Sequence, residues 1–118
     1  MTASPSLSTT VVLFTRDGLG SGEPALQHAL ASRYLGLMLA GDLVPAACCF
    51  YTEGVHLVSE GSPVLEPLAE LERRGCRLLV CTTCLEYYGL RDRLRVGSPC
   101  GMPDILDAQL RAERVITA

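Results

Sequence analysis

The sequence contains no lysine, and all ten of its basic residues are arginine. Thirteen acidic residues give a formal net charge of −3, so the charge balance does not indicate a nucleic-acid partner. No apolar run approaches the roughly 20 residues that span a bilayer, so we expect no membrane partner. The first ten residues lack the basic start and apolar stretch of a secretory signal. We therefore expect a disordered leader over residues 1–10 and a cytoplasmic protein with reduced thiols.

Apolar residues, by contrast, make up 48% of the 118 residues, and they fall into short runs that alternate with amphipathic stretches. The length fits one domain, which we place at residues 11–118. Alternating strands and helices predict an α/β fold, a three-layer sandwich with a mostly parallel sheet of about five strands. The predicted strands are 11–15, 46–51, 76–80, 94–97 and 114–117, and the predicted helices are 23–40, 62–74, 84–88 and 103–111.

Two of these helices have apolar patterns that predict how they pack. The end of the first helix, residues 35–39, is apolar nearly all round, which is more than one sheet face covers, so we expect it in a subunit interface. The residues expected to point inward are Leu26, Ala29, Leu30, Leu37 and Met38 in the first helix, and Ile105, Leu106 and Leu110 in the last.

Six cysteines in a chain without a secretory signal are more often free, catalytic or metal-bound than paired in structural disulfides. Cys48, Cys49 and Cys76 belong to predicted buried strands, where cysteine acts as a small hydrophobic residue. Cys100 falls in a Gly/Pro-rich stretch, where we favour an ordinary loop cysteine over one that approaches the site.

Cys81 and Cys84 form a C-x-x-C motif where the strand 76–80 meets a short helix. Backbone N–H groups and the helix dipole favour a thiolate at such a junction, and the thiolate is the nucleophile. Cys81 is the better candidate, and Cys84 would lie about one turn into the helix. No second C-x-x-C is present, so we expect no metal and no cofactor. A persulfide carrier, a dithiol redox pair and two buried hydrophobic residues remain open.

In parallel sheets, ligands bind outside the carboxyl ends of the strands, and three loops meet there: 18–22, 52–56 and 81–84. The glycine-rich loop 18–22 lacks the Gly-Lys-Ser/Thr ending of a phosphate-binding loop. Binding of a small anion or nucleotide there, by a non-catalytic binding or assembly module, is the alternative function. Candidate residues lining the site are Gly20, Gly22, Gly54, His56, Thr82, Thr83, Arg91 and Arg93.

Several of these segments resemble the DsrE/DsrF-like sulfur-relay family. The similar stretches are 18–23, 50–57, 60–62 and 68–75, and the strongest is 81–90, which reads Cys-Thr-Thr-Cys-Leu-Glu-Tyr-Tyr-Gly-Leu and is followed by Val96 and Gly97. Within that family the chain most resembles the C-terminal DsrE-like domain of the YedF proteins, which are sulfurtransferase-like and associated with selenium metabolism.

The resemblance implies a Rossmann- or flavodoxin-like sandwich that assembles into trimers or hexamers. In relatives the sulfur-accepting cysteine stands eight positions before a glycine, as Cys81 stands before Gly89. Cys81 would thus carry sulfane sulfur, or selenium, as a persulfide, and Cys84 would resolve a persulfide or disulfide. Thr82 replaces the family's usual glycine. YedF proteins carry a TusA-like domain that this sequence does not show, so we expect sulfur donor and acceptor proteins in trans, a TusA-like protein among them.

Overall fold

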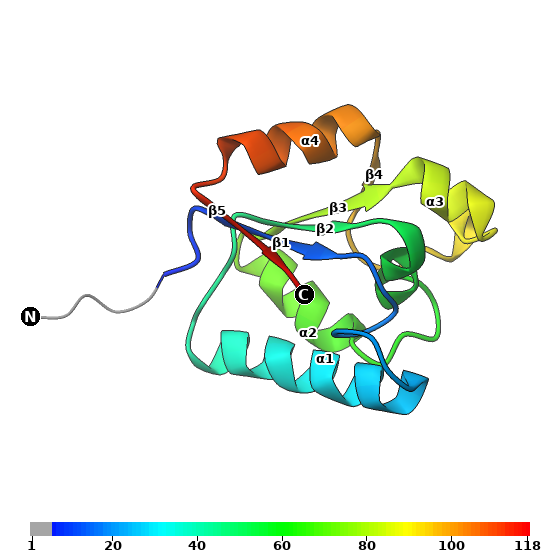
Figure 1. The fold of residues 1–118 in the computed structure, drawn as a ribbon, viewed down its shortest axis with the longest axis horizontal. Coiled ribbons are helices and arrows are strands. Elements are labelled where there is room, and N and C mark those ends of the chain that lie inside the picture. The colour runs from blue at the N-terminus through cyan, green and yellow to red at the C-terminus, as the bar shows by residue number, and fades with distance from the viewer. Residues whose placement is uncertain (1–5) are drawn as a thin grey trace, which may run out of the picture.

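The computed structural model describes residues 6–118, which form one five-stranded sheet with the order β4-β3-β2-β1-β5 (Figure 1). Every neighbouring pair of strands is parallel. The elements in chain order are β1 (Thr10–Phe14), α1 (Pro24–Ala40), β2 (Ala47–Phe50), η1 (Thr52–Val58), α2 (Leu65–Arg73), β3 (Arg77–Cys81), α3 (Thr82–Tyr87), η2 (Arg91–Arg93), β4 (Ser98–Cys100), α4 (Met102–Arg111) and β5 (Arg114–Thr117), where η marks a 3-10 helix.

The two faces of the sheet carry unequal layers (Figure 1). Helices α1 and α2 cover one face, where the rings of Phe14 and Phe50 stack with centroids 5.1 Å apart in the larger core cluster. Helix α4 alone covers the other face, through Ile105 and Ala108. Because side chains alternate along a strand, each central strand feeds both cores, which explains its continuous apolar sequence. The predicted three-layer α/β sandwich with a parallel sheet is confirmed.

Two of the predicted extended or loop segments are different in the structure. The fourth strand is not 94–97 but β4, at the sheet edge, where Pro99 is tolerated because its missing N–H faces away from the partner strand. Leu94 instead makes one antiparallel bridge with Ser59. The predicted loop 52–56 is part of the seven-residue 3-10 helix η1.

The predicted disordered leader also needs correction at its end. Strand β1 begins at Thr10, which is buried, and Leu7 packs against the larger core cluster. Residues 1–5 of that predicted leader lie outside the described residues.

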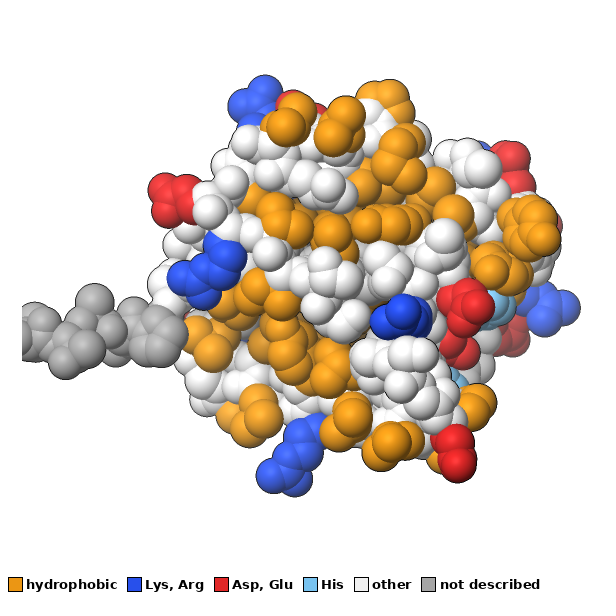
Figure 2. Space-filling model, in the orientation of Figure 1, with side chains coloured by type: hydrophobic (Ala, Val, Ile, Leu, Met, Phe, Trp, Pro, Cys, Tyr) orange, Lys and Arg blue, Asp and Glu red, His pale blue; other side chains and the backbone are white. Residues whose placement is uncertain are grey.

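The predicted inward faces of α1 and α4 are largely wrong. Helix α1 buries Ala31, Leu35 and Met38. Helix α4 buries Ile105 and Ala108. The residues predicted to point inward that are exposed instead are Leu26, Ala29, Leu30, Leu37, Leu106 and Leu110. Figure 2 shows the hydrophobic side chains that gather along α4 and α1 on one side of the molecule. Among residues 6–118, no helix is both long and apolar enough to cross a bilayer.

Candidate functional site: two thiols at the carboxyl end of β3

Strand β3 delivers Cys81 to the carboxyl edge of the sheet, and α3 starts at the next residue. Strand alternation turns Cys81 toward the α4 face, where it joins the smaller core cluster and is 2% exposed. Its partner across the strand pair is Cys100, the last residue of β4. Cys100 is thus not the ordinary loop cysteine that the sequence suggested, since it lies beside Cys81 in the sheet and is half-buried.

Cys84 stands nearly one helical turn after Cys81, as predicted, and is half-buried. It packs against the cluster that contains Cys81. The backbone N–H of Thr52 donates a hydrogen bond to the Cys84 sulfur at 3.0 Å. This contact joins the first residue of η1 to α3, two elements that follow neighbouring strands of the sheet.

Thr52 adopts an unusual backbone conformation to make that contact. Its φ is +47°, a left-handed value that β-branched residues rarely adopt because the side chain crowds the following carbonyl. The Thr52 hydroxyl donates to the carbonyl oxygen of Thr15 at 2.7 Å, which ties it to the end of β1. Gly54 lies so close to Phe14 that an added Cβ would overlap the Phe14 carbonyl oxygen. The start of η1 is thus fixed against β1, and Thr52 is aimed at Cys84.

A cavity of about 260 Å³ opens beside Cys84, lined by Thr52, Thr83, Cys84, Tyr87 and Tyr88. Thr52 and Tyr88 also belong to the wall of a neighbouring polar cavity of about 560 Å³. The polar cavity is completed by Thr15, Arg16, Ser21, Gln27 and Glu53. Cys84 therefore faces a space for a small ligand, and Cys81 does not line this cavity.

Burial raises the pKa of the Cys84 thiol above its ordinary value. The Thr52 N–H acts in the opposite sense, because it stabilises a thiolate, and the neighbouring Cys81 raises the pKa further. The pKa of Cys100 is also raised, first by burial and then by the nearby Asp104 carboxylate. The net shift at Cys84 therefore favours the thiol over the thiolate.

The structure brings some of the predicted lining residues to this site. Thr83 lines the Cys84 cavity, and the Thr82 hydroxyl donates to the Cys100 carbonyl oxygen at 3.2 Å. Gly54 does not line the Cys84 cavity but contributes indirectly, because the absence of a side chain allows η1 to approach β1. His56 reaches the site indirectly, through its ring, which lies 4.7 Å from that of Tyr88.

Other predicted lining residues lie elsewhere. Arg91 pairs with Glu86 at 2.9 Å, and neither Arg91 nor Arg93 lines the Cys84 cavity. The Gly22 N–H donates to the side-chain oxygen of Gln27, in the first turn of α1, at 3.2 Å. Gly20 has a φ of +70°, which is the tight turn that a glycine permits.

The remaining cysteines fill the core, as predicted. Cys48, Cys49 and Cys76 are buried and free, and the sulfurs of Cys48 and Cys76 lie 3.7 Å apart. Burial raises the pKa of Cys49 to about 11. Within the part of the chain that the structure describes, no three His, Cys, Asp or Glu side chains converge in a way that would hold a metal ion.

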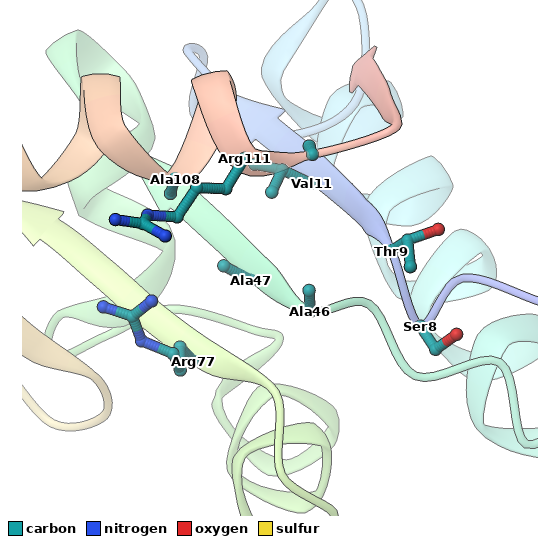
Figure 3. A pocket seen from close by; sticks show the side chains of 9 residues that line it. Ser8, Thr9, Val11, Ala46, Ala47, Arg77, Ala108 and Arg111 are labelled. Atoms are coloured by element: carbon teal, nitrogen blue, oxygen red, sulfur yellow. The ribbon is translucent and has the colours of Figure 1, made fainter.

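Another groove, of about 220 Å³, lies at the opposite end of the sheet (Figure 3). Val11, Ala47 and Arg77, at or near the amino ends of their strands, line it, and Arg111 extends over it from α4. The groove is therefore separated from Cys81 and Cys84 by the length of β3.

Sequence reasoning missed two parts of the site. The sequence predicts that the segment after β2 contributes to the site, but it does not identify Thr52, because nothing local shows that a threonine there takes a left-handed conformation. Tyr87 and Tyr88 are not among the lining residues that the sequence predicts, yet both line the Cys84 cavity and are exposed. Their spacing after Cys84 on a short helix was the available signal.

Comparisons with known proteins agree with this architecture. Residues 10–118 match the DsrE/DsrF-like family. Two similar solved structures are MTH1491, a protein of unknown function from Methanobacterium thermoautotrophicum, and the YchN protein from E. coli. MTH1491 is 21% identical with a TM-score of 0.66, and YchN is 17% identical with a TM-score of 0.67. Each match covers 94% of this chain and 99% of the other. No curated protein gives a significant match.

Proposed function

Because the chain belongs to the DsrE/DsrF-like family, we propose that it is a sulfur-relay protein that holds sulfane sulfur at the Cys81–Cys84 pair, with Cys81 as the persulfide carrier. The observation that supports this proposal most is the meeting of two free thiols, a ligand-sized cavity and the Thr52 N–H at one edge of the sheet. A purely structural pair of cysteines requires neither the cavity nor the N–H donor.

The chemistry is a thiol exchange at sulfur. A cysteine thiolate attacks the outer sulfur of a persulfide donor, the new persulfide forms on the protein, and the donor leaves as a thiolate. The same exchange in the reverse direction delivers the sulfur to an acceptor. Half-burial of the site keeps the bound persulfide away from bulk water and competing thiols.

The finer features of the proposal follow from the resemblance to the YedF proteins. They are use of selenium beside sulfur, a trimeric or hexameric assembly, and donor and acceptor proteins in trans, a TusA-like protein among them. A cytoplasmic location, where thiols stay reduced, is a further part of the proposal. The exposed Leu26, Leu30 and Leu37 on α1 offer apolar area for such an assembly. The alternative, an anion-binding module at the loop 18–22, loses support because Gln27 already occupies the Gly22 N–H.

The test is intact-protein mass spectrometry after incubation with cysteine persulfide, on wild type and a Cys81→Ser/Cys84→Ser double variant. We expect the mass of one sulfur atom to be added to the wild type and not to the double variant. Cys100→Ser is the matched control, since it removes a half-buried neighbouring thiol, and it should load like wild type. Loss of two hydrogens without a gain of sulfur would identify a dithiol redox pair instead.

A further inference from the structure

We propose that Cys84 is the first sulfur acceptor and passes the sulfane sulfur to the buried Cys81, so that one sulfur atom moves through two thiols in sequence. This inference rests on the proposed sulfur-relay function and assigns the order in which the two cysteines act.

The two thiols differ in their access to open space. A donor must bring its outer sulfur into line with the attacking thiolate, and that approach needs open space beside the acceptor. Cys84 has such space, in the cavity of about 260 Å³, whereas Cys81 is 2% exposed among apolar residues of the smaller core cluster. Cys84, which lines the cavity, also packs against the cluster that contains Cys81, so it lies between the open space and the buried part of the site.

Thr52 orients the Cys84 sulfur for this role. Its N–H donates at 3.0 Å and its own position is fixed by the hydroxyl bond to Thr15. A hydrogen bond from an N–H favours the charged form of sulfur, so it assists both the attacking thiolate and the thiolate that Cys84 becomes when it releases sulfur. Thr52 is a positioning residue in this scheme, since it acts on sulfur through its backbone.

Both steps balance without an oxidant or reductant. In the first, the Cys84 thiolate bonds to the outer sulfur of a low-molecular-weight persulfide, the donor's sulfur–sulfur bond breaks, and the donor leaves as a thiolate that takes up a proton. In the second, the Cys81 thiolate bonds to the outer sulfur of the Cys84 persulfide, and Cys84 leaves as a thiolate. Each step moves one neutral sulfur atom from one thiolate to another.

The order of the two transfer steps explains why the Cys81–Cys84 pair contains one buried and one accessible thiol. Cys84 loads quickly but leaves its persulfide open to the cavity. Cys81 stores the sulfur where small reductants do not reach it. We therefore expect the persulfide on Cys84 alone to be stripped by a small thiol much faster than the persulfide of the wild type.

The experiment is rapid quenching after addition of cysteine persulfide, followed by intact mass measurement, on wild type, Cys84→Ser and Cys81→Ser. We expect Cys84→Ser to load at least tenfold more slowly than wild type. Cys81→Ser should load at the wild-type rate and then lose its sulfur to added cysteine at least tenfold faster. Thermal melts of all three establish that they are folded, and Cys84→Ala repeats the slow loading without a hydroxyl.

The outcomes separate the two proposals. Wild-type loading in Cys84→Ser together with no loading in Cys81→Ser would overturn the order in which the two thiols act and leave sulfur carriage by Cys81 intact. No sulfur gain in the wild type would overturn the proposed function and this inference with it.

Discussion

Replacing Gly54 by alanine should disturb both stability and sulfur binding, because this glycine sets the position of η1. The added Cβ would overlap the carbonyl carbon and oxygen of Phe14, which are backbone atoms of the strand at the centre of the β2-β1-β5 ladder and cannot rotate away. Overpacking of this kind costs roughly 1–3 kcal/mol. For a domain of this size that lowers the melting temperature by about 5–15 °C.

We expect η1 to be displaced rather than β1, since β1 is held between β2 and β5 in the sheet, and Thr52 moves with η1. We therefore expect Gly54→Ala to lose the Thr52–Cys84 hydrogen bond and to load sulfur more slowly than wild type. The matched control is Gly36→Ala in α1, where a Cβ meets open space. It should be more stable than wild type by roughly 0.5–1 kcal/mol and load normally. A Gly54→Ala protein with wild-type melting temperature and loading rate would refute this reasoning.

Two further predictions concern stability. Burial raises the pKa of Cys49 from 9.0 to about 11, so the folded state binds the thiol proton more tightly than the unfolded chain does. The protonated thiol therefore contributes fully to the free energy of unfolding below pH 9.0, and this contribution is lost as the pH rises through about 11. The free energy of unfolding, measured with urea at increasing pH across this range, should fall less in Cys49→Ala than in the wild type. Arg74 binds Glu70 at 2.9 Å and the Leu39 carbonyl at 3.1 Å, which ties the end of α2 to that of α1. Arg74→Ala should lose roughly 1 kcal/mol, and an unchanged denaturation midpoint would contradict that role.

Much of the fold could be predicted because the buried strands carry their own signal. The runs at β1, β2 and β3 are apolar without a break, which is what strands covered on both faces require. β4 could not be predicted because Ser98, Pro99 and Cys100 have no strand pattern of their own and form a strand only by pairing with β3. The preceding Leu94 and Val96 look like a strand because they are apolar, but they pack against the larger core cluster instead.

The apolar faces of the outer helices could not be assigned for a related reason. Leu106 and Leu110 follow a helical spacing, but a single helix lying on a sheet buries only the narrow face that carries Ile105 and Ala108. A sequence pattern shows that a helix has apolar residues and does not show how much of its circumference the fold covers.

The candidate site was only partly predictable. Cys81 and Cys84 stand out because the C-x-x-C motif ends a strand. Their unequal burial depends on α4 and on the angle at which α3 leaves the sheet, which local sequence does not encode. The contact with Thr52 joins residues 32 positions apart and depends on a left-handed threonine.

The most direct test of the central claim is peptide mapping of the wild-type protein after loading with cysteine persulfide. Cleavage after arginine places Cys81 and Cys84 together in the peptide of residues 78–91, while the other four cysteines fall in other peptides. The account predicts that the added sulfur is found on residues 78–91. Sulfur found on the peptides that carry Cys48, Cys49, Cys76 or Cys100, and absent from 78–91, would contradict it.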